Sequence, residues 1–172
     1  MTKQKGFTLI ELLVVIAIIG LLASIVMVSL NSARVKARDA KRAAEIKQLA
    51  LAIEMYYDTN GGFPATTGCL NGWCCLGHGT AGRCWAGVYW GIDATDNAIS
   101  PTYLSKIPDD PLNNTAKYGD AYMYRVDGDT ATLHWGIESC SPTSAVCAGG
   151  RYANWGSGNG IGCDYYCMYT FK

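Results

Sequence analysis

The chain has 172 residues, which is enough for one domain of ordinary size with an added segment and too few for two full domains. Fourteen basic and fourteen acidic residues give a formal net charge of zero, so no overall positive field favours binding to nucleic acid, and we expect no specific nucleic-acid partner. Only 16% of the residues are charged and 49% are hydrophobic, a composition that excludes an intrinsically disordered chain.

The two parts of the sequence differ in composition. Residues 1–57 carry eight basic and four acidic residues, hence +4, and contain no cysteine or tryptophan. Residues 58–172 carry six basic and ten acidic residues, hence −4, and contain all eight cysteines and all five tryptophans. We therefore expect a helical N-terminal segment joined to a compact, aromatic, cysteine-rich head.

The N-terminal segment is predicted to begin as a hydrophobic helix. The 28 residues between Lys5 and Arg34 contain a single charged side chain, that of Glu11. As a helix, residues 7–30 span about 36 Å, which is enough to cross a hydrocarbon core of about 30 Å. Because apolar side chains occupy every face, this part requires lipid or other helices around it.

The helix is predicted to continue through residues 31–57 as an amphipathic segment. This region is rich in good helix formers and has one apolar stripe at spacings of three and four residues. A glycine pair at Gly61 and Gly62, followed by Pro64, ends the helix. We expect one helix of about 50 residues from near Thr8 to near Tyr57, whose stripe packs on the head through Ala43, Ile46, Ala50, Ile53 and Tyr57.

A cleaved secretory signal peptide fits this N-terminus poorly. Its apolar run exceeds the usual length of about 7–15 residues, and no A-x-A site follows it. A signal anchor is the simpler alternative. The distribution of positive charges does not decide the orientation of this helix in the membrane. Residues 34–47, after the apolar run, carry six basic and two acidic residues, and only two lysines precede the run.

The carboxylate of Glu11 requires an explanation, because a charge in an apolar helix costs about 2.5–3.5 kcal/mol at the membrane centre and less near an end. Three explanations are possible. The first is a capping box, since Thr8 and Glu11 form a T-x-x-E pattern. The second is extension of the side chain to the membrane interface. The third is an ion pair with a cation on the helix of a neighbouring subunit.

The sequence Lys5-Gly6-Phe7-Thr8-Leu9-Ile10-Glu11, followed by an apolar run, resembles the class III signal of the type IV pilin family, which includes the major pseudopilins of type II secretion. In that family a basic leader is cut after the glycine, the new N-terminal phenylalanine is methylated, and the glutamate is required for assembly. The resemblance covers residues 1–57 well and the head loosely. It implies a leader of residues 1–6, processing between Gly6 and Phe7, methylation of Phe7 and an assembly role for Glu11.

This resemblance has a physical basis. Cleavage before Phe7 creates an α-amine beside lipid, and Glu11 of an adjacent helix is an available counter-ion. Pairing between neighbouring subunits would place them in a helical stagger. Head-to-tail contacts that do not close into a ring generate open filaments. Many members of the family have a proline in the middle of the apolar half. This chain has none, so Gly20 is its one flexible point there.

The head is predicted to add a small antiparallel sheet, which gives an α+β fold of the type IV pilin kind. Residues 121–126 and 131–137 alternate in polarity, and Asp127-Gly128-Asp129-Thr130 between them has turn chemistry. We expect the apolar face of this hairpin to pack on the helix stripe. A third strand is needed for stability, at residues 86–90 or 165–171. Residues 96–104 are predicted to form a helical turn.

The cysteines predict a disulfide scaffold in an oxidising compartment, because they are even in number and lie in a loop-rich head. This places the head outside the cytoplasm and the N-terminus inside. The local pairs Cys140–Cys147 and Cys163–Cys167 are sterically plausible. The candidates for disulfides are Cys69, Cys74, Cys75, Cys84, Cys140, Cys147, Cys163 and Cys167.

Zinc bound by Cys74, Cys75, His78 and Cys84 is an alternative that lacks a C-x2-C pair, so we expect no metal and no cofactor. Asp127 and Asp129 in the hairpin turn have two explanations: calcium binding, which the resemblance to pseudopilins suggests, or the formation of the turn itself. Asn113 begins a formal glycosylation sequon.

Catalysis has little support. His134, one of two histidines, lies in a predicted strand, where an exposed or hydrogen-bonded role is commoner than that of a base. Residues 151–169 are expected to form disulfide-linked core and surface loop, with an adhesive or ligand-contacting surface as the alternative. We expect no enzyme.

Together these features predict a structural subunit of a type IV pilus-like extracellular filament. Expected partners are identical subunits, the prepilin peptidase and N-methyltransferase, and the assembly machinery of the inner membrane. The subunit is expected to be a single-pass membrane protein before assembly and extracellular afterwards. One alternative is the major pseudopilin of a type II secretion system, and an alternative of another class is a membrane-anchored extracytoplasmic binding domain.

Overall fold

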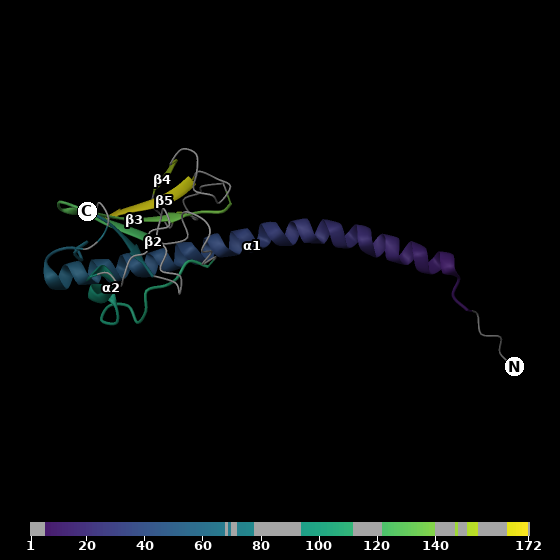
Figure 1. Ribbon diagram of the computed structural model, residues 1–172, viewed down its shortest axis with the longest axis horizontal. Coiled ribbons are helices and arrows are strands. Elements are labelled where there is room, and N and C mark those ends of the chain that lie inside the picture. The colour runs from purple at the N-terminus through teal and green to yellow at the C-terminus, as the bar shows by residue number, and fades with distance from the viewer. Residues whose placement is uncertain are drawn as a thin grey trace. The chain divides into compact units, whose positions relative to one another are not determined.

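The computed structural model describes residues 6–67, 69, 72–77, 94–111, 122–139, 147, 151–154 and 165–171 (Figure 1). The chain divides into two compact units, with the boundary between Val35 and Lys36. The elements are α1 (Leu9–Asn60), β1 (Trp73–Leu76), α2 (Ala94–Ile99), β2 (Tyr122–Asp127), β3 (Thr130–Gly136), β4 (Arg151–Asn154) and β5 (Tyr165–Phe171).

Helix α1 runs for 52 residues, and its ends lie within three residues of the predicted ones. It contains an 18-residue window with a mean hydropathy of 3.0, none of which is buried. By length and composition, this helix can therefore cross a membrane. The prediction of one long helix, apolar in its first half, is confirmed.

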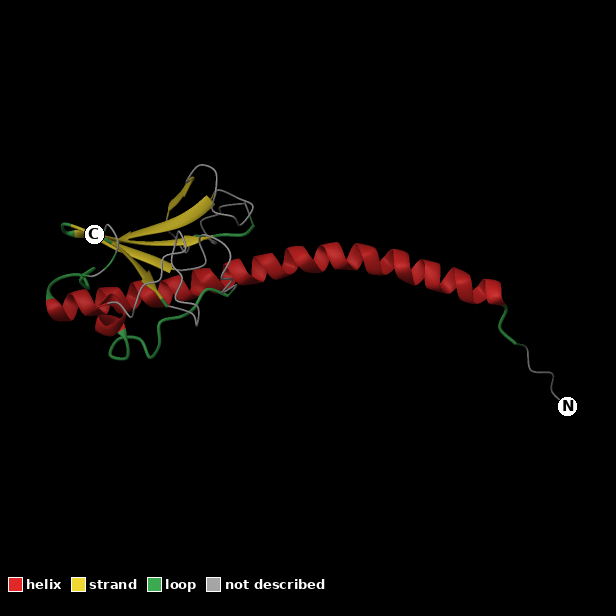
Figure 2. Ribbon diagram, viewed as in Figure 1, coloured by secondary structure: helices red, strands yellow, loops and turns green. Residues whose placement is uncertain are grey.

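The head contains a five-stranded antiparallel sheet in the order β1-β2-β3-β5-β4 (Figure 2). The predicted hairpin is confirmed as β2 and β3, which pair Asp127 with Thr130 across a turn in which Gly128 has a φ of 59°. Strand β5 is the predicted third strand and pairs with β3. The other candidate, residues 86–90, lies outside the described residues, and β1 and β4 were not predicted.

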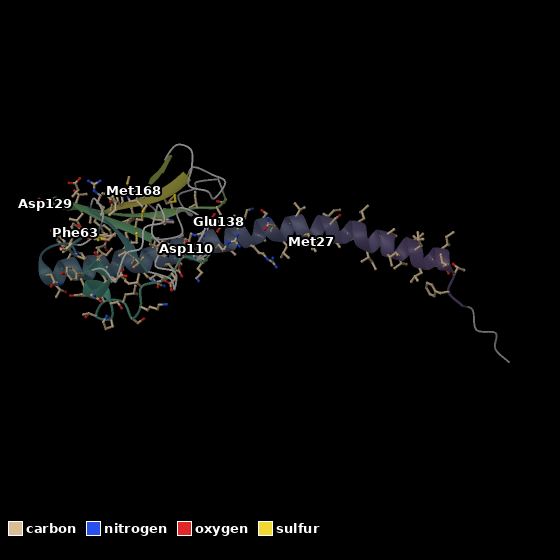
Figure 3. The ribbon with its side chains drawn as sticks, viewed as in Figure 1. Met27, Phe63, Asp110, Asp129, Glu138 and Met168 are labelled. Carbon is tan, nitrogen blue, oxygen red and sulfur yellow. A yellow bond between two sulfur atoms is a disulfide. The ribbon has the colours of Figure 1, made fainter. Side chains whose placement is uncertain are left out.

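The core forms between the sheet and the part of α1 that belongs to the head (Figure 3). The register pairs Tyr124 with Leu133, so both side chains lie on the same face of the sheet. The predicted stripe is correct except at its last position, because Tyr57 is 42% exposed. The buried core residues include Ala43, Ile46, Leu49, Ala50 and Ile53 of α1 and Tyr122, Tyr124, Leu133, Trp135 and Phe171 of the sheet.

One glycine fixes the loop that follows α2 against the end of β1. Gly77 has a φ of +66°, a conformation that L side chains rarely adopt. A Cβ atom there would lie 2.1 Å from the backbone oxygen of Pro108. The close approach therefore requires glycine.

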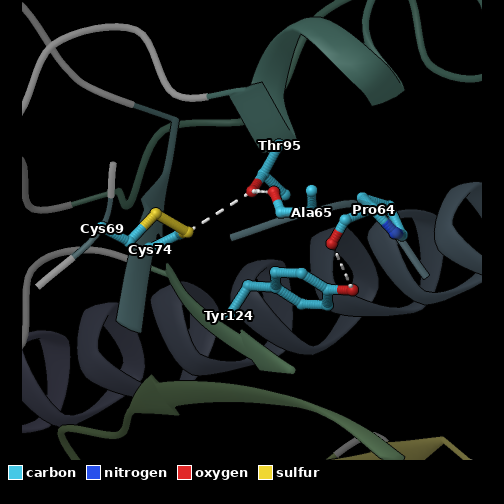
Figure 4. Close-up of a disulfide and its surroundings, with 6 residues drawn as sticks. All are labelled: Pro64, Ala65, Cys69, Cys74, Thr95 and Tyr124. Atoms are coloured by element: carbon cyan, nitrogen blue, oxygen red, sulfur yellow. Dashed lines mark hydrogen bonds between the residues drawn. A yellow bond between two sulfur atoms is a disulfide. The ribbon is translucent and has the colours of Figure 1, made fainter. Parts of the chain in front are cut away.

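Two disulfides are described, Cys69–Cys74 and Cys147–Cys167, and none of the described cysteines is free. The first lies beside Thr95, whose hydroxyl donates to the backbone oxygen of Ala65 at 2.8 Å (Figure 4). The second ties the segment before β4 to β5.

The second disulfide corrects the predicted local pairs. Cys147 and Cys167 bond to each other, so neither pairs with Cys140 or Cys163; the fold brings together two cysteines that are 20 residues apart in the sequence. The zinc alternative is also wrong, since Cys74 and Cys75 are both in disulfides and supply no thiolate. Cys84, Cys140 and Cys163, as well as His78 and Asn113, lie outside the described residues.

Candidate assembly site

The first turn of α1 is closed by a capping box. The backbone N–H and the hydroxyl of Thr8 both donate to Oε2 of Glu11, at 2.8 Å and 2.7 Å. In return, the backbone N–H of Glu11 donates to Oγ1 of Thr8 at 3.3 Å. These bonds satisfy backbone donors that a helix end leaves without partners. In the single chain, Glu11 therefore has the role given by the first of the three explanations.

The peptide bond between Gly6 and Phe7 lies just before this turn. Neither residue belongs to a helix or strand, and the Phe7 side chain is 82% exposed. The structure thus brings together three of the predicted site residues at one helix end, with the Glu11 carboxylate one turn from the residue that would carry a new amine.

The apolar surface of the first half of α1 is almost completely uncovered. From Phe7 to Leu30 the large hydrophobic side chains are between 46% and 82% exposed. The hydroxyl of Ser24 donates to the backbone oxygen of Leu21 at 2.7 Å, so this polar group is satisfied within the helix. Soluble monomers rarely expose a continuous apolar surface of this extent. It is therefore a surface for lipid or for other helices.

A buried charged network, which we call the arginine clamp, joins α1 to the head through Arg38, Asp39, Arg42, Asp110 and Glu138. Arg42 and Asp39 are each 1% exposed. Arg42 donates to both oxygens of Asp110 at 2.6 Å and 2.9 Å, to Asp39 at 2.8 Å and to Glu138 at 2.6 Å. Figure 3 shows Asp110 and Glu138 beside α1.

The clamp also uses the backbone. The Asp39 carboxylate accepts the N–H groups of Glu138 and Ser139 at 3.0 Å and 2.9 Å. Arg38 donates two parallel bonds to Glu138, from Nε at 2.8 Å and from an Nη at 2.5 Å. Such paired arginine–carboxylate bonds fix geometry as well as contributing energy. The clamp therefore sets one register of the head along the helix.

The bonds of the clamp favour the charged forms of Arg42 and Glu138. Burial by itself lowers the pKa of Arg42, but its bonds to Asp110 and Glu138 raise the pKa above its ordinary value. Burial raises the pKa of Glu138, and the two arginines outweigh this and lower it. The clamp was not predicted from the sequence, although Asp39 and Arg42 continue the buried stripe of α1 by one turn.

The other candidates have structural roles. The side chain of Asp127 is 80% exposed and pairs with Arg125 at 3.2 Å, which is consistent with a turn. Among the described residues, no three potential metal ligands gather. His134 is buried against Trp73, with ring centroids 4.6 Å apart, so of the two expected roles, exposed or hydrogen-bonded, the exposed one is wrong. Burial and the charge of Arg125 lower its pKa to about 4, so it is neutral at pH 7.

The family model of the prokaryotic N-terminal methylation motif matches residues 1–27. Type II secretion system core protein G of Vibrio cholerae is 31% identical over 133 residues, which cover 77% of this chain and 78% of the relative. Core protein G of Aeromonas hydrophila is 42% identical over 148 residues, covering 76% of this chain and 88% of that protein. The chain belongs to the core protein G family.

Two further core protein G sequences match shorter parts of the chain. The relative from Pseudomonas aeruginosa is 32% identical and covers 67% of this chain and 73% of its own length. The relative from Escherichia coli is 45% identical over 64 residues, which are 37% of this chain. No solved structure matches. These relatives are named after the type II secretion system, which is the alternative to a pilus given above. The chain is a pilin-like filament subunit.

Proposed function

We propose that this chain is the major pseudopilin of a type II secretion system, the subunit that polymerises into its filament. One observation carries the proposal: similarity to core protein G extends over more than two thirds of both chains. The exposed apolar half of α1 supports it, because burial of that surface between subunits would drive polymerisation. The role is structural, without an enzymatic step.

We infer that residues 1–6 are a leader that a prepilin peptidase removes, and that Phe7 then becomes a methylated N-terminus. The match of the methylation motif to residues 1–27 and the exposure of the Gly6–Phe7 bond support this. Before assembly, α1 would hold the subunit in the inner membrane with the head outside the cytoplasm. The described disulfides support that topology, since they persist in oxidising compartments.

Glu11 would gain a second partner on assembly. In the single chain its carboxylate is held by Thr8. In the filament it would also face the amine of Phe7 from a neighbouring subunit, and an ion pair in an apolar interior is stronger than one in water. The capping bonds are compatible with this role, because they leave Oε1 for a second donor.

Deletion of the gene in the native cell tests the proposal. For a pseudopilin we expect the loss of proteins normally released into the medium, with surface pili unchanged at native expression. Loss of surface filaments with normal release would assign the chain to a pilus instead. Mass analysis of the purified protein checks processing: a chain that retains Met1 would contradict both forms of the proposal.

The substitution Glu11→Gln separates capping from intermolecular pairing. Glutamine can still accept the bonds of Thr8, so a capping role alone predicts a change of a few tenths of a kcal/mol and normal filaments. Loss of one partner of a buried ion pair costs about 3–5 kcal/mol, or two to four orders of magnitude in each association constant. We expect processed subunit in the membrane without filaments, measured by comparing sheared filaments with membrane fractions. Normal filaments would refute the pair.

A further inference from the structure

A hollow of about 480 Å³ lies where the end of α1 meets β5. This volume falls in the range of about 300–1,000 Å³ that is typical of ligand sites. Every described residue that lines it lies in the compact unit that begins at Lys36. We call it the aromatic pocket; its lining consists of Glu54, Tyr57, Asp58, Phe63, Tyr169, Thr170 and Phe171.

Four aromatic rings form a continuous series along the pocket. The ring centroids of Tyr57 and Phe63 lie 4.6 Å apart, those of Phe63 and Phe171 5.7 Å apart, and those of Tyr169 and Phe171 5.0 Å apart. Phe171 is 4% exposed and anchors the series in the core, whereas Tyr57 is 42% exposed. Figure 3 shows Phe63 near the C-terminal end of α1. Aromatic faces attract cations that approach within about 6 Å of the ring centroid.

Two carboxylates stand beside these rings. Glu54 and Asp58 are four residues apart on α1, so their like charges lie on one helix face and repel each other. The hydroxyl of Tyr169 donates to Oε1 of Glu54 at 3.2 Å and so orients this carboxylate at the pocket. In the described part of the chain, no lysine or arginine forms an ion pair with either acid. The pocket therefore carries negative charge that the described residues do not neutralise.

We propose that the aromatic pocket binds a small organic cation of the ammonium or guanidinium class. The rings provide apolar contact and an attractive quadrupole, and the two acids provide the opposite charge. Hard metal ions prefer shells of six or more oxygen ligands, which two carboxylates among aromatic walls do not supply. The residues 58–172, which carry −4, further favour a cation over an anion. The ligand can be a free molecule or the basic side chain of a polypeptide.

A titration of the full-length processed protein tests this site. The protein is kept in a maltoside detergent, because detergents with choline headgroups would compete. Choline is compared with 3,3-dimethylbutan-1-ol, an uncharged molecule of the same shape, by isothermal calorimetry. We expect choline to bind with a Kd of about 1 mM or below and the alcohol to bind at least tenfold more weakly. Equal binding of the two, or binding of neither choline nor the arginine peptide below, overturns the proposal.

Matched variants locate the binding. Tyr57→Leu removes one exposed ring and should weaken choline binding about two- to thirtyfold. The double substitution of Glu54→Gln and Asp58→Asn should abolish the difference between choline and the alcohol. Asp127→Asn removes an exposed acid outside the pocket and should change nothing, with circular dichroism confirming that each variant is folded. Unchanged choline binding in both pocket variants would place the cation elsewhere and overturn the assignment.

The source of the cation is read from a second pair of ligands, the peptides Gly-Arg-Gly and Gly-Gln-Gly. Binding of the arginine peptide at least tenfold tighter than choline, and lost in the pocket variants, would assign the pocket to a basic side chain. Choline binding that exceeds peptide binding would assign it to a free molecule. Because these measurements do not use filaments or secretion, their outcome is independent of the proposed function.

Discussion

Replacement of Arg42 by methionine should destabilise the head strongly, because it removes the centre of the arginine clamp while keeping a side chain of similar length. Glu138 would keep its bonds from Arg38, and Asp39 would keep two backbone N–H groups. Asp110 would lose both of its bonds from Arg42. The substitution therefore removes two charge-assisted bonds from one buried carboxylate, and removal of one partner of a buried pair costs about 3–5 kcal/mol.

The free energy of unfolding measures this effect. The full chain is unfolded in urea with its disulfides intact, in non-ionic detergent, and the near-UV circular dichroism of the tryptophans reports on the head. The matched control is Lys41→Met, the neighbouring position, whose side chain is 58% exposed and lies 3.5 Å from Glu45. Exposed pairs of this kind contribute less than about 1 kcal/mol.

A second variant makes the test specific to charge. Adding Asp110→Asn to Arg42→Met removes the buried negative charge that faced Arg42, so it should recover part of the lost stability. A loss for Arg42→Met no larger than that for Lys41→Met would refute the reasoning. So would a double variant that is less stable than the single one, since the cost would then not come from the buried charge of Asp110 facing a neutral side chain.

Three further predictions concern the head. Because burial lowers the pKa of His134 from 6.5 to about 4, the unfolded chain binds a proton between these pH values that the folded chain does not. As the pH decreases through this window, the free energy of unfolding should decrease by about 3 kcal/mol. A difference in this free energy between wild type and His134→Gln that stays constant from pH 7 to 4 would contradict this. Gly77→Ala should destabilise the head by about 1–3 kcal/mol more than Gly72→Ala in urea unfolding, since both glycines have positive φ but a Cβ atom at Gly72 meets nothing within 4 Å. Replacing Cys147 and Cys167 by serine should cost about 2–4 kcal/mol; non-reducing peptide mapping should find these two cysteines linked, and a link within either of the local pairs would count against it.

The sequence predicted those parts of the fold whose signals are local. Apolar composition marked α1, and alternation around Asp127-Gly128-Asp129-Thr130 marked the hairpin. Strand β1 was not predicted, because it has only four residues, two of them cysteines, and its pairing with β2 joins segments about 50 residues apart. No local pattern signals such a pairing.

The candidate site divides in the same way. The cap at Glu11 follows from a four-residue pattern, so the sequence predicted it. The arginine clamp joins residues from three distant segments, and charged residues on a helix are usually assigned to a solvated face. One signal was available: Asp39 and Arg42 lie one turn before Ala43 and Ile46 on the buried stripe. A charge pair in line with a buried stripe indicates partners elsewhere in the chain.

The position of β5 in the sheet makes completion of the head depend on the far end of the chain. Strand β5 lies between β3 and β4, and β4 pairs with no other described strand. A chain that stops before Tyr165 would leave β3 with an unpaired edge, a common starting point for aggregation. Without β5 the described sheet is reduced to β1, β2 and β3, and β4 loses its pairing partner. A head without β5 is therefore structurally distinguishable from one that contains it.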